Sequence, residues 1–312
     1  MRGGRHRLGG AAGDLLNPVM TSAVTYTHWH LGDDEAVLPF LLKEAWVARE
    51  AYLHKFDDPL LEPKGVHLAW QGSTVVGHVM TCRRPVFMEG RVQLLGGIGQ
   101  MLVAENLRGT GVGRTLLHRA LEYLTGKGCR AVSLRTNTGL QRALKFYSAA
   151  GFRLWAEEVV HTLDTGSAEA NTGLALRTIT PDEAMPVRLE WARSNFPVCC
   201  DARAFRSRDN LLGGWEDGRL VGYLEHDGEK VNDAAVVGAS AAGMIRAALT
   251  FAAQRGADTI AWHTAANGFW DQVLRQFSNE RKVTVNIRLL RPLGPDLDPS
   301  TQRPSWATIH TW

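Results

Sequence analysis

The sequence predicts an α/β (α+β) protein built from two tandem domains, and two observations lead to this prediction. Segments with alternating apolar residues, typical of strands, are interleaved along the chain with segments whose apolar residues have helical spacing. The same order of strands and helices then begins again near residue 174. The length of 312 residues is long for one compact domain and sufficient for two.

The first domain is predicted over residues 23–163. Gly126 and Gly128 follow one of its helical segments and Gly151 follows another, and glycine commonly ends a helix. Strands are expected at residues 24–30, 66–70, 74–80, 92–103, 131–135 and 152–163, and helices at 35–54, 114–125 and 140–150.

A linker and a second domain are predicted next. Residues 164–173 are small and polar and have no apolar periodicity, so we expect a linker there. The second domain is predicted over residues 174–312, with a tight hairpin at 212–224 around Asp217-Gly218. Further strands are expected at 174–179, 258–262 and 282–290, and helices from residue 181, at 241–255 and at 269–277.

Short stretches of similar sequence indicate an internal duplication. Asp33-Asp-Glu-Ala36 in the first domain resembles Pro181-Asp-Glu-Ala184 in the second. Thr74-Val-Val-Gly77 likewise resembles Arg219-Leu-Val-Gly222. We interpret the two domains as copies of one unit. A loose resemblance between two unrelated α+β domains stays open as the alternative.

The charge balance and the N-terminal segment exclude several kinds of partner. The net charge is +3 and charged residues make up 21%, which is too mild for nucleic acid or a membrane surface as the main partner. Residues 1–22 are rich in glycine and arginine and lack the apolar core of a signal peptide, so we expect a disordered tail. We therefore expect a cytoplasmic protein without a membrane partner.

Neither the histidines nor the cysteines form a metal-binding pattern. His28 and His30 share one face of a predicted strand, but the sequence offers no third ligand, so an exposed edge strand is favoured over a metal site. The cysteines form no C-x-x-C pair, which favours reduced thiols and no metal. They are Cys82, Cys129, Cys199 and Cys200.

One glycine-rich loop carries the clearest chemical signal, and it lies between an extended run and a strongly helical segment. Glycine permits a positive φ and close approach of a ligand to backbone amides. Successive N–H groups at the start of the helix, with two arginines beside them, would then bind a pyrophosphate. The loop comprises Arg108, Gly109, Thr110, Gly111, Val112, Gly113 and Arg114.

Other chemistries of glycine loops fit this one less well. A dinucleotide-binding fold places G-x-G-x-x-G after its first strand, whereas this loop follows several strands. A P-loop requires Gly-Lys-Ser/Thr, whereas the sequence here ends Gly113-Arg114-Thr115. A tight turn between strand and helix, without a ligand, stays open as the plain alternative.

Two motifs in this region resemble the GCN5-related N-acetyltransferases, the GNAT superfamily. Its signature Q/R-x-x-G-x-G/A, at a junction of strand and helix, is met by Arg108, Gly111 and Gly113. A second family segment, A-x-x-F-Y-x-x-x-G-F, is met by residues 143–152. The resemblance covers residues 23–163. It implies tandem GNAT-like domains, each with a mixed, largely antiparallel twisted sheet flanked by helices.

The resemblance implies acetyl-CoA as co-substrate, and it implies which residues hold it. The loop from Arg108 to Arg114 would bind the pyrophosphate. The preceding strand would present backbone groups to the pantetheine arm, and Asn137 would bond to the same arm. As a bare asparagine, Asn137 fits equally well as a turn residue. The strand residues are Met101, Leu102 and Val103.

The family transfers the acetyl group directly from the thioester to an amine, without a covalent enzyme intermediate. The resemblance therefore implies a primary amine, on a small molecule or a peptide, as the acceptor. A backbone N–H near Val103 would stabilise the developing oxyanion. Tyr147 would protonate the departing thiolate or donate a hydrogen bond to it, and simple packing is the alternative role for this tyrosine.

The sequence does not assign a general base. Many relatives carry a glutamate in the middle of the strand before the loop, whereas this chain has Ile98-Gly99-Gln100 there. Glu105 is expected in a solvated loop, and His118 and Glu122 are expected along the outer side of the loop helix. The missing glutamate leaves a second function open, a non-catalytic sensor or scaffold that binds acyl-CoA.

The second domain lacks an equivalent of the glycine loop. Its connection over residues 238–243 is shorter and contains no arginine. It cannot form the same anion site, so we expect the second domain to pack against the first and to wall the acceptor site. Binding of nucleic acid through the basic N-terminal tail is a remote third hypothesis.

Overall fold

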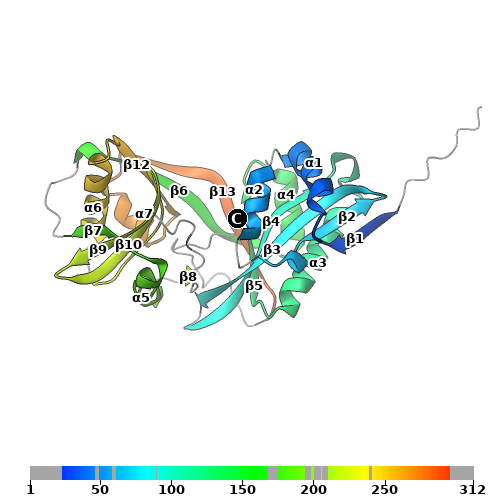
Figure 1. The fold of residues 1–312 in the computed structure, drawn as a ribbon, viewed down its shortest axis with the longest axis horizontal. Helices are drawn as coiled ribbons and strands as arrows, with labels where there is room; N and C mark the ends of the chain where they lie inside the picture. Colours follow the sequence, from blue (N-terminus) through cyan, green and yellow to red (C-terminus); the bar gives the residue numbers. More distant parts are fainter. Residues whose placement is uncertain are drawn as a thin grey trace, which may run out of the picture.

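Figure 1 shows the protein as a computed structural model, an elongated molecule with two lobes joined by a narrow middle. The structure describes residues 23–45, 49–57, 61–88, 90–167, 174–193, 198–199, 205, 210–238 and 241–295. The tail predicted at 1–22 lies outside the described residues, as does the greater part of the predicted linker, residues 168–173.

A single mixed sheet runs through both lobes. In order along the sheet, its strands are β1 (Val24–His28), β2 (His67–Gln71), β3 (Thr74–Met88), β4 (Arg91–Val103), β5 (Ala131–Asn137), β13 (Glu280–Pro292), β6 (Arg153–Asp164), β12 (Thr259–Ala265), β11 (Lys230–Val236), β10 (Arg219–Asp227), β9 (Leu211–Glu216) and β7 (Ala175–Thr178). A short strand off this path, β8 (Val198–Cys199), pairs with β3. Only β4 with β5 and β11 with β12 are parallel in the described sheet, which confirms the predicted fold class.

Helices cover both faces of the sheet in the first lobe. In chain order, the α-helices of the described residues are α1 (Asp34–Ala45), α2 (Arg49–Leu53), α3 (Val112–Gly126), α4 (Gln141–Ala149), α5 (Pro181–Ala192), α6 (Ala241–Ala253) and α7 (Phe269–Leu274). Val79 of β3 packs in the core of α3 and α4, whereas the next residue, Met80, packs in the core of α1 and α2. Successive side chains of a strand point to opposite faces, so the two helix pairs lie on opposite faces of the sheet. None of the described helices is long and apolar enough to span a membrane.

Close packing positions α3 over β3 and β4. Val112, Leu116, Ala120 and Leu124 of α3 are all buried, and residues four apart share one face of a helix. Glycines of the sheet face this helix: a Cβ atom on Gly77 would lie only 2.8 Å from Leu116, and other glycines behave similarly. The absence of side chains there lets α3 approach the sheet, which fixes where the helix begins relative to the end of β4.

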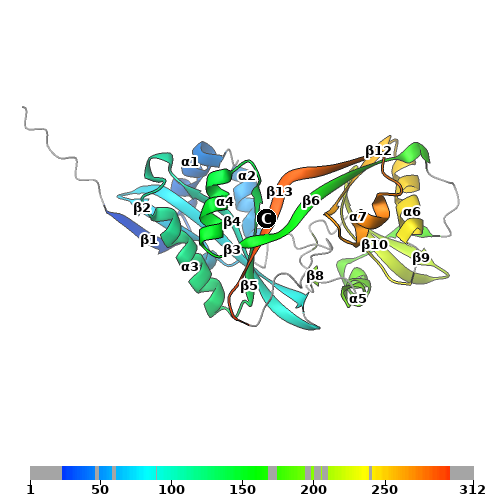
Figure 2. The ribbon, with the colours of Figure 1, turned by 180° about the vertical axis from the view of Figure 1, so that it is seen from behind.

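The two halves repeat one arrangement and exchange one strand each. In the first half, the sheet runs from β1 to β5 and continues through β13 to β6. In the second half, it runs from β7 to β12 and continues through β6 to β13. β6, which follows the last helix of the first half, is thus inserted into the sheet of the second half. β13, which follows the last helix of the second half, is inserted into the sheet of the first half. Figure 2 shows β6 and β13 side by side in the narrow middle that this exchange creates.

Two local sequence signals are confirmed. Asp217 and Gly218 both have a positive φ, 49° and 76°, as a two-residue hairpin turn between β9 and β10 requires. At the start of α5, Thr180 and Glu183 form a capping box, with Pro181 in the first turn.

Three elements differ from the sequence-based expectation. The single helix expected at 35–54 is represented in the described residues by two helices, α1, which ends at Ala45, and α2, which begins at Arg49. β3 extends to Met88, well beyond the expected end at residue 80. The sequence does not predict β11, because residues 230–236 lack clear alternation and bury Asp233.

Candidate active site

The site begins where two parallel strands separate. β4 and β5 pair only through Leu95–Ile98 and Ala131–Leu134. Beyond these residues β4 continues to Val103, while β5 continues to Asn137 and pairs with β13 on its other side. The edge of β4 that faces this gap therefore offers backbone N–H and C=O groups to an extended ligand.

The three strand residues expected to contact the cofactor arm form the end of β4 beside this gap. Met101 and Val103 pack with the core beneath α3, and Leu102 packs with the core beneath α1. A Cβ atom on Gly113, at the start of α3, would lie 3.4 Å from Cγ2 of Val103. The fold therefore brings the strand end and the glycine loop together.

Two glycines give the loop its shape. Gly109 and Gly111 have φ values of 94° and 101°, a region that favours glycine. Gly111 is the N-cap residue of α3, and no side chain caps the helix there. A Cβ atom on Gly111 would meet no described atom within 4 Å. The first amides of α3 are consequently open to a ligand, and their partial positive charge suits an anion such as pyrophosphate.

The remaining loop residues divide into structural and exposed ones. The hydroxyl of Thr110 donates a hydrogen bond of 2.7 Å to the carbonyl oxygen of Leu107, which tightens the turn. Val112 is buried in the core beneath α3. Arg114 is exposed in the first turn of α3, so its guanidinium group is free to approach a bound phosphate.

Arg108 holds the loop in place. Its Nε donates to the carbonyl oxygen of Val103 at 3.0 Å, and its Nη2 donates to Oε2 of Glu44, on α1, at 2.7 Å. The Glu44 side chain is only 6% exposed but that of Arg108 is 40% exposed, so water screens this ion pair in part. Arg108 therefore joins the loop, the end of β4 and α1, and part of its charge is already neutralised.

Arg142, on α4, is a residue that the sequence analysis missed. A Cβ atom placed on Gly109 would lie 3.4 Å from Nη2 of Arg142, so the guanidinium group stands directly beside the loop. Arg142 is exposed. No spacing rule connects the two positions, because only the packing of α4 against α3 brings them together.

Tyr147, also on α4, packs in the core beneath α3. It packs in the same core as Ile98 and Leu134, the last paired residues of β4 and β5, and only 9% of it is exposed. Burial raises its pKa to about 12, so the hydroxyl is protonated at neutral pH. The hydroxyl has no hydrogen-bond partner among the described residues, so it remains able to donate to a ligand.

Asn137 ends β5 on the other side of the gap. Its Oδ1 accepts a hydrogen bond of 2.7 Å from the backbone N–H of Gly139, which is the turn role that the sequence left open. The side-chain amide nitrogen is not used in this turn. A contact between that nitrogen and the cofactor arm stays a prediction.

A bulge in β4 marks the point where the strand leaves β5. Gln100 has a φ of 46°, which is unusual for a residue other than glycine. The pairing with β3 shifts at the same place, from Met80↔Gly99 to His78↔Leu102. One extra residue therefore stands in β4 beside the gap. A run of glycines, residues 96, 97 and 99, is the one sequence signal of this irregular backbone.

The carboxylate and histidine candidates near the loop are exposed. Glu105 lies on the surface in the turn after β4. His118 and Glu122, on α3, form an exposed pair 3.7 Å apart. These positions match the solvated loop and the outer side of the loop helix, where the sequence analysis expects the three side chains.

The connection that replaces the loop in the second half is shorter. β4 ends at Val103 and α3 begins at Val112, whereas β11 ends at Val236 and α6 begins at Ala241. The core of this half contains a buried ionic cluster. In it the hydroxyl of Tyr223 donates a hydrogen bond of 2.7 Å to Oδ2 of Asp233, and Nη2 of Arg188 lies 3.2 Å from the same oxygen.

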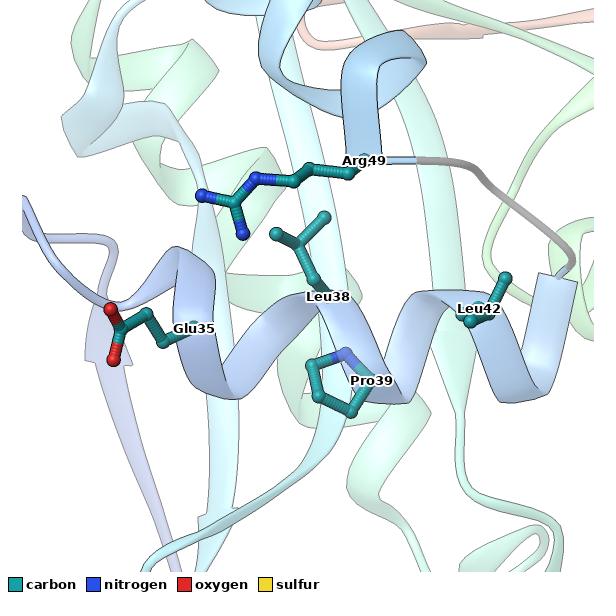
Figure 3. Close-up of a pocket in the computed structure, with 5 residues that line it drawn as sticks. All are labelled: Glu35, Leu38, Pro39, Leu42 and Arg49. Carbon is teal, nitrogen blue, oxygen red and sulfur yellow. The ribbon is translucent and has the colours of Figure 1, made fainter.

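A pocket of about 460 Å³ on α1 and the start of α2 lies apart from these residues. Figure 3 shows Leu38, Pro39 and Leu42 along α1, with Glu35 and Arg49 at the rim. None of the residues expected in the active site lines this pocket.

Within the described part of the chain, no group of three or more His, Cys, Asp or Glu side chains is placed to hold a metal ion.

One family model matches the part of the chain that contains the gap and the loop. Residues 29–152 match the model described as "Acetyltransferase (GNAT) family". This range includes β4, the glycine loop, β5 and Tyr147.

Curated proteins named mycothiol acetyltransferase are similar to part of this chain. The protein from Streptomyces bingchenggensis is 26% identical over 168 residues, which cover 49% of this chain and 50% of that protein. The protein from Thermobispora bispora is 30% identical over 104 residues, which cover 33% of this chain and 35% of that protein. The matches thus span half or less of the length of these relatives.

Solved structures are similar to both halves of the chain. A GCN5-related N-acetyltransferase from Kribbella flavida has a TM-score of 0.66 at 17% identity, covering 88% of this chain and 72% of that one. A probable N-acyltransferase from Enterococcus faecalis V583 has a TM-score of 0.68 at 12% identity, covering 87% and 73%. At this level of identity the likeness shows a shared fold.

Proposed function

We propose, from the premise that this chain belongs to the GNAT superfamily of acetyltransferases, that it transfers an acetyl group directly from acetyl-CoA to a primary amine. The observation that carries the proposal is the gap between β4 and β5, which adjoins the open start of α3. A single extended ligand with an anionic group at one end fits both features.

The described residues suit each part of the cofactor. The pyrophosphate would lie on the first amides of α3, with Arg114 and Arg142 beside it. The pantetheine arm would lie along the end of β4, where Met101, Leu102 and Val103 extend beyond the pairing with β5 and where the carbonyl oxygen of Val103 already accepts a hydrogen bond from Arg108. The thioester would then lie near the bulge at Gln100, above Tyr147.

The reaction needs few groups from the protein. The amine nitrogen attacks the thioester carbon, a C–N bond forms, and the C–S bond breaks as the tetrahedral intermediate collapses. Backbone N–H groups of β4 stabilise the oxyanion. The amine loses one proton to solvent and the thiolate takes one up, so the protons balance.

Tyr147 is proposed to donate a hydrogen bond to the leaving sulfur. Its pKa of about 12 exceeds the value of roughly 8.5 for an ordinary thiol, so full transfer of its proton to the thiolate is unfavourable. A charge-assisted hydrogen bond stabilises the thiolate without that transfer. Between the two roles that the family resemblance allows, the burial of Tyr147 favours hydrogen bonding.

The acceptor is proposed to be a primary amine on a small molecule or a peptide. Because curated relatives are named mycothiol acetyltransferases, an amine precursor of mycothiol belongs in the first screen.

We further propose a first domain over residues 23–163 that binds acetyl-CoA, and a second domain over 174–312 that walls the acceptor site without binding the cofactor. Cys82 and Cys129 are buried thiols that form no disulfide bond within the described residues, which fits a reducing compartment such as the cytoplasm.

Binding of acyl-CoA without catalysis is the second candidate function. The strand region in which many GNAT proteins carry a glutamate has Ile98-Gly99-Gln100, and none of these side chains can act as a base. In that case the protein would bind acetyl-CoA as a sensor or scaffold and would release no free CoA with any amine.

Calorimetric titration with acetyl-CoA tests the proposal. The wild-type protein should bind one acetyl-CoA per chain, and Gly111→Val should abolish binding, because valine strains a φ of 101° and blocks the loop. Gly128→Val, with a φ of 78° at the other end of α3, carries similar strain and should bind normally.

A thiol-release assay with an amine panel then separates the two candidate functions. Release of CoA that depends on an amine supports the transferase, whereas binding without release supports the sensor. Absence of acetyl-CoA binding by the wild-type protein would overturn both.

A further inference from the structure

The carbonyl group at the β4 bulge is held by a buried histidine. Nδ1 of His78, on β3, lies 2.9 Å from the backbone oxygen of Gln100. A carbonyl oxygen only accepts hydrogen bonds, so Nδ1 carries the hydrogen and donates it. Burial lowers the pKa of His78 to about 4, so the ring is neutral at pH 7 and this is its one N–H.

A second contact fixes the ring of His78. Its Nε2 lies 3.4 Å from the hydroxyl of Tyr52, on α2. Because Nδ1 carries the hydrogen, Nε2 accepts and the hydroxyl donates. Both side chains are completely buried, and their rings meet edge to face with centroids 5.7 Å apart. Packing therefore prevents the histidine from turning away from Gln100.

The direction of this carbonyl group decides the direction of the next amide. The C=O of Gln100 and the N–H of Met101 belong to one trans peptide group and point in opposite directions. The ring of His78 contacts Tyr52 of α2, so the C=O of Gln100 points toward the face of the sheet that α1 and α2 cover. The N–H of Met101 therefore points away from that face.

We infer that His78 is a positioning residue, which aims the amide of Met101 at the carbonyl oxygen of the bound acetyl group. The inference rests on the proposed function, since it requires the thioester of acetyl-CoA in the gap. That oxygen becomes negative when the amine attacks, and a fixed N–H donor stabilises it without reorganisation. Without the hydrogen bond from His78, little opposes the strain at Gln100, and the peptide group is free to rotate.

Two substitutions distinguish the ring nitrogens of His78. The side-chain nitrogen of asparagine takes the place of Nδ1, and that of glutamine takes the place of Nε2. His78→Asn should therefore keep the hydrogen bond to Gln100, whereas His78→Gln should lose it. Both variants bury one neutral amide group, so the cost of burying a polar side chain is similar in the two and does not affect the comparison.

Acetyl-CoA with an isotope label at its thioester carbonyl reports the contact directly, without any acceptor amine. The infrared carbonyl band of the bound ligand should have the same frequency in the wild-type protein and in His78→Asn, and a higher frequency in His78→Gln. The affinity for acetyl-CoA should fall about three- to tenfold in His78→Gln, the effect of one hydrogen bond. The affinity for CoA, which lacks the carbonyl group, should not change.

The outcomes separate the inference from the proposed function. The positioning role alone would be overturned if His78→Gln left both the carbonyl band and the ratio of the affinities for acetyl-CoA and CoA unchanged. It would also be overturned if His78→Asn lost as much affinity for acetyl-CoA as His78→Gln. Failure of the wild-type protein to bind acetyl-CoA would overturn the proposed function and the inference with it. If His78→Gln does not fold, Tyr52→Phe releases Nε2 and should shift or broaden the band; an unaltered band there would also contradict the positioning role.

Discussion

His161 of β6 and Asp271 of α7 form a hydrogen bond of 2.7 Å, and both side chains are completely buried. The same carboxylate accepts two hydrogen bonds from Arg281 of β13, at 2.8 and 2.9 Å, and one from Arg275, at 2.9 Å. The backbone N–H of Asn267 donates a further one, at 2.7 Å. Asp271 thus ties the two exchanged strands, β6 and β13, to the second half.

Replacement of Asp271 by alanine should destabilise the whole protein. It would leave the buried ring of His161 without its hydrogen-bond acceptor, which costs about 1–3 kcal/mol, and it would also remove the carboxylate that pairs with the partly exposed Arg281. Urea unfolding measures the loss. Glu122→Ala removes an exposed pair with His118 and should change the free energy of unfolding by less than about 0.5 kcal/mol. Similar losses in the two variants would show that Asp271 does not hold the exchanged strands.

Acid should destabilise the protein through His78. Burial lowers its pKa to about 4 in the folded state, against about 6.5 in an unfolded chain. Below pH 6.5 the unfolded state binds more protons, so stability is complete above that pH and declines as the pH falls toward 4. A difference of this size corresponds to about 3 kcal/mol.

The variant His78→Asn isolates this contribution. Because asparagine does not titrate, the fall in the free energy of unfolding between pH 7 and pH 4 should be smaller in His78→Asn by about 3 kcal/mol. Urea unfolding at the two pH values gives the comparison. An identical fall in both proteins would assign the acid sensitivity to other groups, such as His67, whose pKa burial also lowers to about 4.

Local patterns in the sequence predict the elements of this fold but not the exchange of strands. The Asp217-Gly218 turn, the helix start at Pro181 and the apolar spacing of α3 depend on residues that are neighbours in the chain. The patterns of β6 and β13 are also clear, but a strand pattern carries no record of which strand it pairs with. The topology therefore needed the structure.

In the candidate site, too, some features can be predicted from neighbouring residues of the sequence and others cannot. The loop glycines are visible in the sequence because their function requires a particular backbone. The contact between Arg142 and Gly109, the ion pair of Arg108 and the support of Gln100 by His78 arise from packing between distant segments. Isolated arginines and histidines are too common in sequences to indicate such contacts.

Tyr147→Phe should slow turnover with little effect on cofactor binding. A hydrogen bond to a charged sulfur is worth about 1.5–3 kcal/mol, which corresponds to roughly 10- to 100-fold in turnover. Steady-state kinetics with an acceptor from the amine screen, together with acetyl-CoA titration, separates the two effects. Because the pKa of Tyr147 is about 12, wild-type turnover should show no loss from its ionisation below about pH 10. Unchanged turnover in Tyr147→Phe would leave the tyrosine with a packing role.

Arg142→Ala should weaken binding of acetyl-CoA. The guanidinium group stands beside Gly109, where the pyrophosphate is proposed to lie, and loss of one arginine–phosphate contact should reduce the affinity about tenfold. Lys145→Ala, one turn further along α4, removes an equal and exposed charge that does not come within 4 Å of a Cβ atom on Gly109, and it should have little effect.

Salt dependence then distinguishes a direct contact from a general field effect. Exposed charges farther apart than about 8 Å are largely screened at physiological ionic strength, so a field effect should vanish there and a direct contact should persist. At that ionic strength Arg142→Ala should still bind acetyl-CoA more weakly than Lys145→Ala. Equal affinities of the two variants would mean that α4 contributes only diffuse positive charge, and the phosphates would then have to be held by Arg114 and the amides of α3 alone.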